Sequence, residues 1–283
     1  MSKSNIIKKI RVGHSPDPDD AFMFYGLASG QVRTPGYEIV QVLDDIESLN
    51  RLALNGEIEV TAVSIHAFAH LTDRYLLLPC GASMGDGYGP LVVTSKPATV
   101  SDLRSMTIAV PGTLTSAMLA LRLAVGEVKT EVVRFDRILD SVREGRHDAG
   151  VLIHEGQLTY GASGVHRILD LGEWWRKETE GLPLPLGGNV IRRDLGAQTI
   201  AEVGALLHES IAFGLEHRDE SLTYAMQFGR GIGRDIADRF VGMYVNDYTL
   251  DYGEAGRRAI ETFLKRGHEA GVLPRPVEIE YAG

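Results

Sequence analysis

The sequence predicts an α/β protein of two lobes, each with a mainly parallel sheet, and a ligand cleft between the lobes. Apolar segments typical of strands alternate with helical segments and short turns, a pattern that gives parallel sheets with right-handed crossovers. The order strand, helix, strand, helix, strand occurs twice, over residues 7–64 and again over residues 106–154. The chain also has 283 residues, more than the roughly 250 at which a single core tends to divide.

The first repeat begins with a strand that ends near His14 and leads into the sequence SPDPDD at residues 15–20. Asp17 suits the N-cap of the following helix and Pro18 its first position, and Gly30 suits its end. The remaining elements of this repeat are a strand, a helix that ends at a glycine and a third strand, at residues 37–43, 44–56 and 58–64.

The second repeat has the same five elements in the same order. They are expected at residues 106–110, 116–125, 131–135, 137–144 and 148–154. Gly126 and Gly145 stop its two helices. When Gly145 is superposed on Gly56 of the first repeat, Ser64 falls beside Ile153 and His154, so Ser64 and His154 both lie at the end of the third strand of their repeat.

The two repeats imply a lobe organisation in which the chain crosses between the lobes twice. We expect residues 1–93 and 190–283 to form the larger first lobe, and residues 94–189 to form the second lobe as an insertion. Helical patterns from residue 200 onward are expected to pack on the first lobe. Two crossings at neighbouring places would act as a hinge.

The charge and composition exclude several classes of partner. The chain carries 29 Lys and Arg against 38 Asp and Glu, a net charge of −9, without a basic cluster. We therefore expect no binding to nucleic acid or to an anionic membrane. No apolar run reaches the roughly 20 residues of a membrane span. The first 20 residues lack the apolar core of a secretory signal, which predicts a cytoplasmic protein.

The single cysteine, Cys80, follows an apolar run and is expected to be a buried, inert thiol. His66 and His70 are spaced to share one helical face and could hold a metal ion, but no H-E-x-x-H motif or third ligand accompanies them. We therefore expect no metal site. Trp174 and Trp175 are expected in the core or at the interface between the lobes.

Ligands of open α/β sheets bind at the carboxyl ends of the strands. Four segments follow strands in the two repeats, at residues 14–15, 64–65, 111–117 and 154–155. If the lobes face each other, these segments line one cleft, and Ser15 and Ser64 become candidate ligand contacts.

The segment that begins the first helix of the second repeat, PGTLTSA at residues 111–117, suits an anion. A helix start presents free backbone N–H groups, and Thr115, Ser116 and Ala117 lie there. No phosphate-loop motif is present, so a carboxylate is a better ligand than a nucleoside triphosphate. The alternative is that Thr115 or Ser116 merely caps the helix.

His154 ends an apolar strand at a position open to the cleft, and imidazole is well suited to proton transfer near neutral pH. The alternative is a structural histidine with its hydrogen bonds satisfied. Glu155 could orient the ring or act alone, but adjacent strand residues point to opposite faces.

Five short motifs in this order resemble the 1,4-dihydroxy-6-naphthoate synthase family of the futalosine route to menaquinone. They are SPDPDDAFMF at 15–24, IHE with TY at 153–160, DLGEWW at 170–175, PLGG at 185–188 and YVNDY at 244–248. Many members of that family have Cys and Asn where this chain has Asp17 and Asp19.

The resemblance implies a type II periplasmic-binding-protein fold used for catalysis in the cytoplasm. It also implies a lyase that converts cyclic dehypoxanthine futalosine into 1,4-dihydroxy-6-naphthoate without a cofactor. His154 would be the proton acceptor, and the substrate contacts would come from Ala62, Val63 and Ser64 and from Ser116 and Ala117.

Two other functions remain open from the sequence. One is chorismate dehydratase, a related activity on the same fold that also takes a carboxylate substrate. The other is a solute-binding protein without catalysis, which alone would imply a membrane permease as a partner. In each case the partner is a small-molecule carboxylate, and the helical C-terminus, rich in Tyr and Phe, could form a homodimer.

Overall fold

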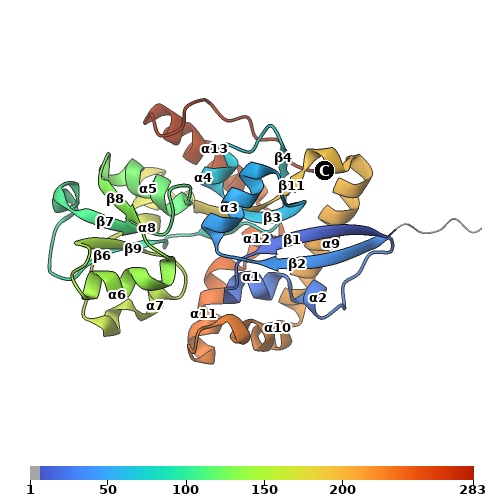
Figure 1. Cartoon of the computed structure of the whole chain (residues 1–283), viewed down its shortest axis with the longest axis horizontal. Helices are drawn as coiled ribbons and strands as arrows, with labels where there is room; N and C mark the ends of the chain where they lie inside the picture. The colour runs from blue at the N-terminus through green and yellow to red at the C-terminus, as the bar shows by residue number, and fades with distance from the viewer. Residues whose placement is uncertain (1–6) are drawn as a thin grey trace, which may run out of the picture.

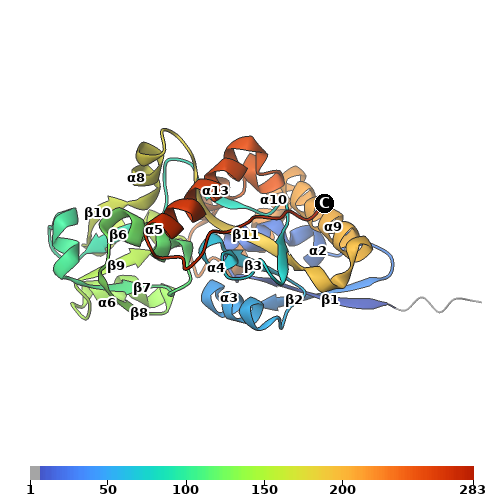
Figure 2. The same cartoon turned by 90° about the horizontal axis from the view of Figure 1, so that it is seen from above.

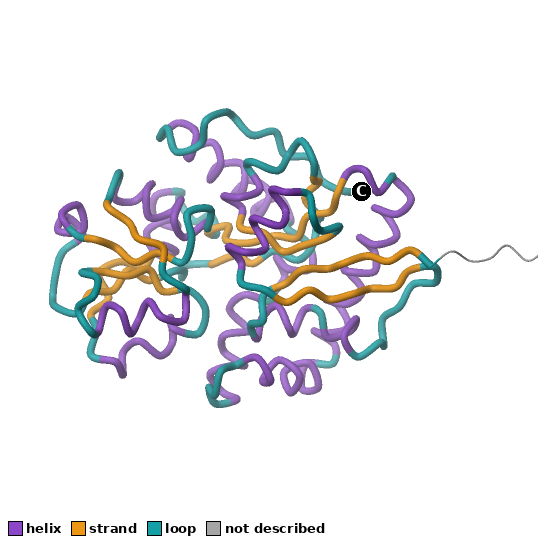
Figure 3. Tube along the Cα trace, in the orientation of Figure 1, coloured by secondary structure: helices purple, strands orange, loops and turns teal. Residues whose placement is uncertain are grey.

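The computed structural model describes residues 7–283. It consists of two lobes side by side, each with a sheet flanked by helices (Figures 1 and 3). The prediction of two α/β lobes is therefore confirmed. The N-terminal segment used to predict the absence of a secretory signal begins in residues 1–6, which lie outside the described residues.

The first repeat forms one edge of the first sheet. Its strands lie in the order β2-β1-β3 and run parallel to one another. The strands are β1 (Lys8–His14), β2 (Tyr37–Leu43) and β3 (Val60–Ser64). The helices between them are α1 (Pro18–Met23), α2 (Tyr25–Ala28) and α3 (Ile46–Asn55).

The second repeat forms the matching part of the second sheet, in the order β8-β7-β9 and again parallel. The strands are β7 (Thr107–Val110), β8 (Lys129–Val132) and β9 (Ala149–Leu152). The helices between them are α5 (Ser116–Val125) and α6 (Ile138–Arg143). The internal repeat predicted from the sequence is therefore confirmed, and the structure shows that its strands have the same lateral order in both sheets.

Both sheets are mixed, not mainly parallel as the sequence predicted. β11 (Leu184–Arg192) runs antiparallel to β3, and β6 (Leu91–Thr94) runs antiparallel to β9. Each of these two strands comes from the other lobe and enters its sheet at the carboxyl ends of the parallel strands. It must then run back along its neighbour, which makes the pair antiparallel.

Three short strands complete the sheets. They are β4 (Tyr75–Leu77) and β5 (Ser83–Gly85), both antiparallel to β11, and β10 (His166–Asp170), antiparallel to β6. Because β6 pairs within the second sheet and β11 within the first, we propose that the chain crosses between the lobes at residues 86–90 and 179–183. Both places lie a few residues before the boundaries expected from the sequence.

The long C-terminal helices pack mainly on the first lobe, as predicted. These helices are α9 (Ala197–Glu216), α10 (Arg218–Ala225), α11 (Arg234–Tyr244) and α13 (Gly253–Glu269). Helices α9 and α10 contact α1 and α2, and α11 contacts α1. Helix α13 differs, because it lies along β11 and also contacts α5 of the second lobe (Figure 2). The short helices are α4 (Ile65–Phe68), α7 (Gly156–Thr159), α8 (Leu171–Glu178) and α12 (Asp247–Leu250).

An apolar cluster joins the two lobes beneath α13. Val63 of the first lobe, Leu119 of the second lobe and Phe263 of α13 belong to the same buried cluster. Trp175 is fully buried in it, packs edge-on against Phe263 and donates a hydrogen bond from Nε1 to the carbonyl of Pro183. The core position expected for Trp175 is confirmed. Because a buried Trp side chain contributes a large apolar area, this cluster helps to hold the two lobes together.

Two further expectations can be compared with the structure. Cys80 is buried, and desolvation raises the pKa of its thiol to about 12, as expected for an inert cysteine. Among the helices of residues 7–283, none combines the length and apolar character needed to cross a membrane.

Candidate functional site

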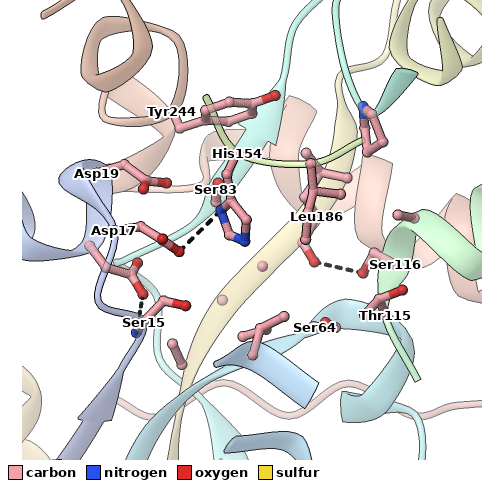
Figure 4. Close-up of a pocket in the computed structure, with 18 of the residues that line it drawn as sticks. Ser15, Asp17, Asp19, Ser64, Ser83, Thr115, Ser116, His154, Leu186 and Tyr244 are labelled. Carbon is pink, nitrogen blue, oxygen red and sulfur yellow. Dashed lines mark hydrogen bonds and ion pairs between the residues drawn. The ribbon is translucent and has the colours of Figure 1, made fainter. Parts of the chain in front are cut away.

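The strand ends of both lobes face one cavity (Figure 4). About 730 Å³ of space lies between its walls, part of it open to solvent. All the residues singled out from the sequence as catalytic or substrate-binding line it, namely Ser15, Ala62, Val63, Ser64, Thr115, Ser116, Ala117 and His154. The prediction that the strand exits form one cleft is therefore confirmed, whereas the chemical role of each residue stays a prediction.

His154 lies just after β9 and projects into this cavity (Figure 4). Its Nδ1 atom is 3.0 Å from Oδ2 of Asp17. Its Nε2 atom is buried and has no hydrogen-bond partner among the described residues. Phe135 packs edge-on against the ring, with the centroids 4.5 Å apart. The ring is thus held from two sides, with its second nitrogen free on the cavity side.

Asp17 occupies the N-cap position of α1, as predicted, but its side chain makes no capping hydrogen bond. The carboxylate instead turns toward His154 and toward Arg230, whose Nη2 atom lies 2.8 Å from Oδ1. Only 1% of the Asp17 side chain is exposed. The capping role predicted from local sequence is wrong, because a buried carboxylate gains more from a cation than from a helix N-terminus.

Arg230 connects Asp17 to the second lobe. Its Nη1 atom lies 3.0 Å from Oε1 of Glu155, and its guanidinium lies 4.6 Å above the ring of Phe135. Burial alone would lower the pKa of Arg230, but the carboxylates of Asp17 and Glu155 raise it above its ordinary value. Glu155 therefore binds Arg230. Its position is explained by this ion pair, without a role in orienting the His154 ring or in catalysis.

Three carboxylates gather at this end of the cavity, from Asp17, Asp19 and Asp20. Oδ2 of Asp20 accepts a hydrogen bond of 2.6 Å from the backbone N–H of Ser15. Burial and the charge of Asp17 raise the pKa of Asp20 to about 7. Burial and the charges of Asp20 and Asp17 raise the pKa of Asp19 well above its usual range. Near neutral pH the carboxyl groups at this end of the cavity are therefore partly protonated and partly negatively charged.

The floor of the cavity is the end of β3. Ser64 is fixed there by Asn50 of α3, whose Oδ1 accepts from the Ser64 N–H at 2.9 Å and whose Nδ2 donates to the Ser64 hydroxyl at 3.2 Å. Ala62 and Val63 are buried beside it. Because Asn50 takes both groups of Ser64, the serine hydroxyl is oriented before any ligand arrives.

The start of α5 faces the acidic end across the cavity (Figure 4). The Thr115 hydroxyl accepts a hydrogen bond from the N–H of Met118, so the capping alternative holds for this residue. The Ser116 hydroxyl donates to the carbonyl of Leu186 at 2.6 Å and accepts from the N–H of His66 at 3.2 Å. Neither hydroxyl is free, and what remains for an anion is the backbone N–H groups of Ser116 and Ala117.

His66 and His70 do not form a metal centre in the described part of the chain. Residues 7–283 contain no group of three His, Cys, Asp or Glu side chains placed to hold a metal ion. Nδ1 of His66 instead contacts the carbonyl of Thr115 at 3.2 Å. Burial lowers the pKa of His66 to about 4, so the ring is neutral and helps to hold α4 against the start of α5.

Further contacts hold the two lobes together around the cavity. Glu47 of α3 accepts hydrogen bonds from the hydroxyl of Thr113 and the N–H of Leu114, both at 3.3 Å. The hydroxyl of Tyr244 in α11 donates to Oε1 of Gln157 in α7 at 2.7 Å. The lobes are therefore closed on each other in this structure.

Sequence reasoning missed Glu47, Asn50, Gln157 and Arg230. Glu47 and Asn50 flank the apolar face of their helix, and polar side chains beside such a face were an available signal. Arg230 stands between Gly229 and Gly231, and nothing in that local sequence points to a cleft on the other side of the lobe.

The fold resembles that of known binding proteins. An alkanesulfonate-binding protein of Xanthomonas axonopodis covers 95% of this chain with a TM-score of 0.69 at 16% identity. A Candida albicans protein described as having the generic periplasmic-binding-protein fold covers the same share with a TM-score of 0.68 at 15% identity. At such low identity these likenesses show the fold alone, and they confirm the predicted periplasmic-binding-protein-like class.

Closer relatives match almost the whole chain. A model of a family described as menaquinone biosynthesis matches residues 10–269. A protein of Archaeoglobus fulgidus with a solved structure is 47% identical and covers 96% of this chain and 100% of its own, with a TM-score of 0.89.

Two relatives carry the name 1,4-dihydroxy-6-naphthoate synthase. The one from Thermus thermophilus is 40% identical over 96% of this chain and 99% of its own length, and the one from Streptomyces coelicolor is 37% identical over 94% and 95%. By these matches over nearly its full length, the chain belongs to the menaquinone biosynthesis family that includes the 1,4-dihydroxy-6-naphthoate synthases.

Proposed function

We propose that this chain is a lyase of menaquinone biosynthesis that converts cyclic dehypoxanthine futalosine into 1,4-dihydroxy-6-naphthoate, with His154 as the proton acceptor. The observation that carries the proposal is Nε2 of His154, which is buried on the wall of the cavity and has no hydrogen-bond partner within residues 7–283. The names of the two synthases that match nearly the whole chain support the reaction. They also separate it from chorismate dehydratase and from solute binding.

In the proposed reaction neutral His154 uses the Nε2 lone pair to remove a proton from the spiro ring of the substrate. The electron pair left behind starts carbon–carbon cleavage and eliminations that end in a naphthalene ring. Formation of the aromatic ring supplies much of the driving force, so the chemistry requires a well-placed base and no cofactor.

The charges around the cavity support one orientation of the substrate. Asp17, Asp19 and Asp20 lie at the end that His154 faces, where a substrate carboxylate would be repelled. The N–H groups of Ser116 and Ala117 lie at the other end and suit that carboxylate. The spiro ring would then lie against His154, with Ser64 below it.

The closed lobes would keep water away from the reactive intermediates. Because the chain belongs to a family of biosynthetic enzymes, we propose that it works in the cytoplasm, where the menaquinone precursors are made. The partner would be the small-molecule carboxylate substrate itself.

The test is incubation of the purified protein with cyclic dehypoxanthine futalosine, and separately with chorismate, with the products followed by absorbance and mass. We expect the dihydroxynaphthoate from the first substrate and nothing from the second. His154→Ala and His154→Gln should keep the fold and substrate binding while turnover falls roughly 100-fold or more. His166→Gln, at an exposed histidine of the same lobe, is the matched control and should retain turnover.

Each other outcome would assign a different function. Dehydration of chorismate would make the chain a chorismate dehydratase. Tight binding of either compound without turnover would make it a binding protein and His154 a ligand contact. Unchanged turnover in both His154 variants would remove this residue from the mechanism.

A further inference from the structure

We infer that Asp17 is a positioning residue that reaches His154 from the opposite lobe and sets the base in its working tautomer only when the lobes close. Arg230 holds Asp17 in place and, through its ion pair with Glu155, holds the lobes together. This inference rests on the proposed function, in which Nε2 of His154 accepts the proton. Local sequence does not connect these residues, since Asp17 suits a helix cap and Arg230 stands between two glycines.

The four groups of this network come in pairs from the two lobes. Asp17 precedes α1 and Arg230 precedes α11, both in the first lobe, whereas His154 and Glu155 follow β9 of the second. Each of the two contacts between the lobes, Asp17 with His154 and Arg230 with Glu155, is 3.0 Å long. A base in one lobe is thus oriented by a group in the other.

The buried carboxylate of Asp17 determines which nitrogen of His154 carries the proton. Oδ1 of Asp17 is occupied by Arg230, while Oδ2 is buried and receives no aligned hydrogen bond from the described residues. Nδ1 of His154 lies 3.0 Å from Oδ2, although the ring is turned so that the contact is not linear.

A proton on Nδ1 satisfies the buried oxygen once the ring turns to align the N–H with Oδ2, and an unsatisfied carboxylate oxygen is costly. The same proton position leaves the lone pair on Nε2, which faces the cavity. In water a neutral imidazole carries its proton on either nitrogen, so a partner is needed to fix the tautomer. Asp17 therefore makes Nε2 the acceptor.

The backbone also indicates that this network is enforced by its surroundings. Only three non-glycine residues within the described range have positive φ, and two of them are His154 at 59° and Arg230 at 47°. Such conformations are unfavourable for a residue with a side chain and persist when contacts compensate. Here the compensating contacts are the ones that join the lobes.

Asp17→Asn is the sharpest test, because it keeps the size of the side chain. Arg230 is a donor and would still bind the oxygen of the new amide, so the amide NH₂ would face Nδ1 of His154. Because the NH₂ group can only donate, Nδ1 would have to accept, and the proton would move to Nε2. Nitrogen-15 NMR at alkaline pH reads the tautomer directly, and His154→Gln identifies its signals among the nine histidines. We expect wild-type protein protonated at Nδ1 and Asp17→Asn protonated at Nε2.

The same variant has a kinetic signature. With the proton on the wrong nitrogen, kcat should fall about 100-fold or more while KM changes less than about threefold. Asp17→Ala removes the acceptor that faces Nδ1 without replacing it by a donor. This variant should give a mixture of tautomers and an intermediate kcat. A wild-type spectrum with Nε2 protonated, or an Asp17→Asn variant with unchanged tautomer and kcat, would overturn the role of Asp17.

The part played by Arg230 is tested by the distance between the lobes. Leu43→Cys and Val132→Cys place spin labels at exposed ends of corresponding strands in the two lobes, and the only native cysteine, Cys80, is buried. In a protein labelled at both sites, Arg230→Met and Glu155→Gln should each add a population of longer distances.

Arg234→Met is the matched control, because Arg234 forms a 2.9 Å ion pair with Asp219 of its own lobe. Its distance distribution should equal that of the doubly labelled parent. If Arg230→Met and Glu155→Gln also equal the parent, the pair does not hold the lobes and that part of the inference fails. Neither the tautomer nor the distance requires substrate, so both results stand apart from the test of the proposed function.

Discussion

Gly112 of the second lobe lies directly against the carboxylate of Glu47 of the first lobe. A β-carbon added to Gly112 would lie 2.2 Å from Oε2 of Glu47, which is far inside contact distance. The same carboxylate accepts hydrogen bonds from Thr113 and Leu114. The absence of a side chain at residue 112 therefore allows the two lobes to meet at this point.

Gly112→Ala should disfavour the closed form. The new methyl group displaces the Glu47 carboxylate from Thr113 and Leu114, while the unfolding free energy changes little because φ at this residue is not in the left-handed region. We expect KM to rise by about tenfold or more with a smaller change in kcat, because a hydrogen bond to a charged group contributes roughly 1.5–3 kcal/mol. Gly161→Ala, at a glycine of the same lobe with open space around it, should leave KM unchanged.

Ser116→Ala should destabilise the protein. The Ser116 hydroxyl is buried and joins the carbonyl of Leu186 to the N–H of His66, so its removal leaves two buried groups without their partner. We expect a loss of about 1–3 kcal/mol in the unfolding free energy measured in urea. KM for the substrate should stay within about twofold, because the proposed anion contact uses the backbone N–H groups. A large rise in KM at unchanged stability would instead make the hydroxyl a substrate ligand.

Binding of an anionic ligand should weaken as the pH rises through about 7. The pKa of Asp20 is raised to about 7 by burial and by the charge of Asp17, so above that pH Asp20 adds negative charge to the cavity. Calorimetric affinity for the product carboxylate should be about three- to tenfold lower at pH 8 than at pH 6. Asp20→Asn removes this titration and should flatten the profile. An equally steep profile in that variant would assign the effect to another group.

Acid should destabilise the fold partly through His66. Burial lowers its pKa to about 4 in the folded protein, against about 6.5 when unfolded. Between these values only the unfolded state binds the proton, so stability is complete above about pH 6.5 and falls as the pH drops toward 4. The loss from this residue between pH 7 and pH 5 is about 2 kcal/mol.

His66→Asn isolates this contribution. An Asn side chain can still donate to the carbonyl of Thr115, as Nδ1 of His66 does, but it does not titrate. Urea denaturation at several pH values should show a shallower loss of stability on acidification than for the unchanged protein. Parallel curves for the two proteins would mean that His66 is protonated in the folded state or that it is not buried.

The sequence predicted the fold well where local signals repeat. The glycines that end helices and the apolar strand segments located both β-α-β-α-β units, and the strand ends pointed to Ser64 and His154. The rule that ligands bind at strand ends then placed the site, because it depends only on strand direction. The antiparallel strands were missed, since a strand that arrives from the other lobe looks the same in sequence as a parallel one.

Within the site, local rules failed where a side chain had a choice of partners. Asp17 and Ser116 both sit at helix starts, and helix-start chemistry predicts a cap or an open anion site for each. In the structure Asp17 turns to Arg230 and His154, and Ser116 turns to Leu186. Those partners lie far away in the chain and are stronger or more buried than the local ones.

The sequence by itself therefore determined the two repeats, the face on which the cleft opens and the histidine that faces it. Only the tertiary structure decided that Asp17 of one lobe orients His154 of the other, and that Arg230 and Glu155 meet beside them. The physical reason is the separation along the chain over which each kind of interaction acts. Strand and helix signals act between residues a few positions apart, whereas contacts between lobes depend on how two separately built sheets are packed, which the burial of the whole chain decides.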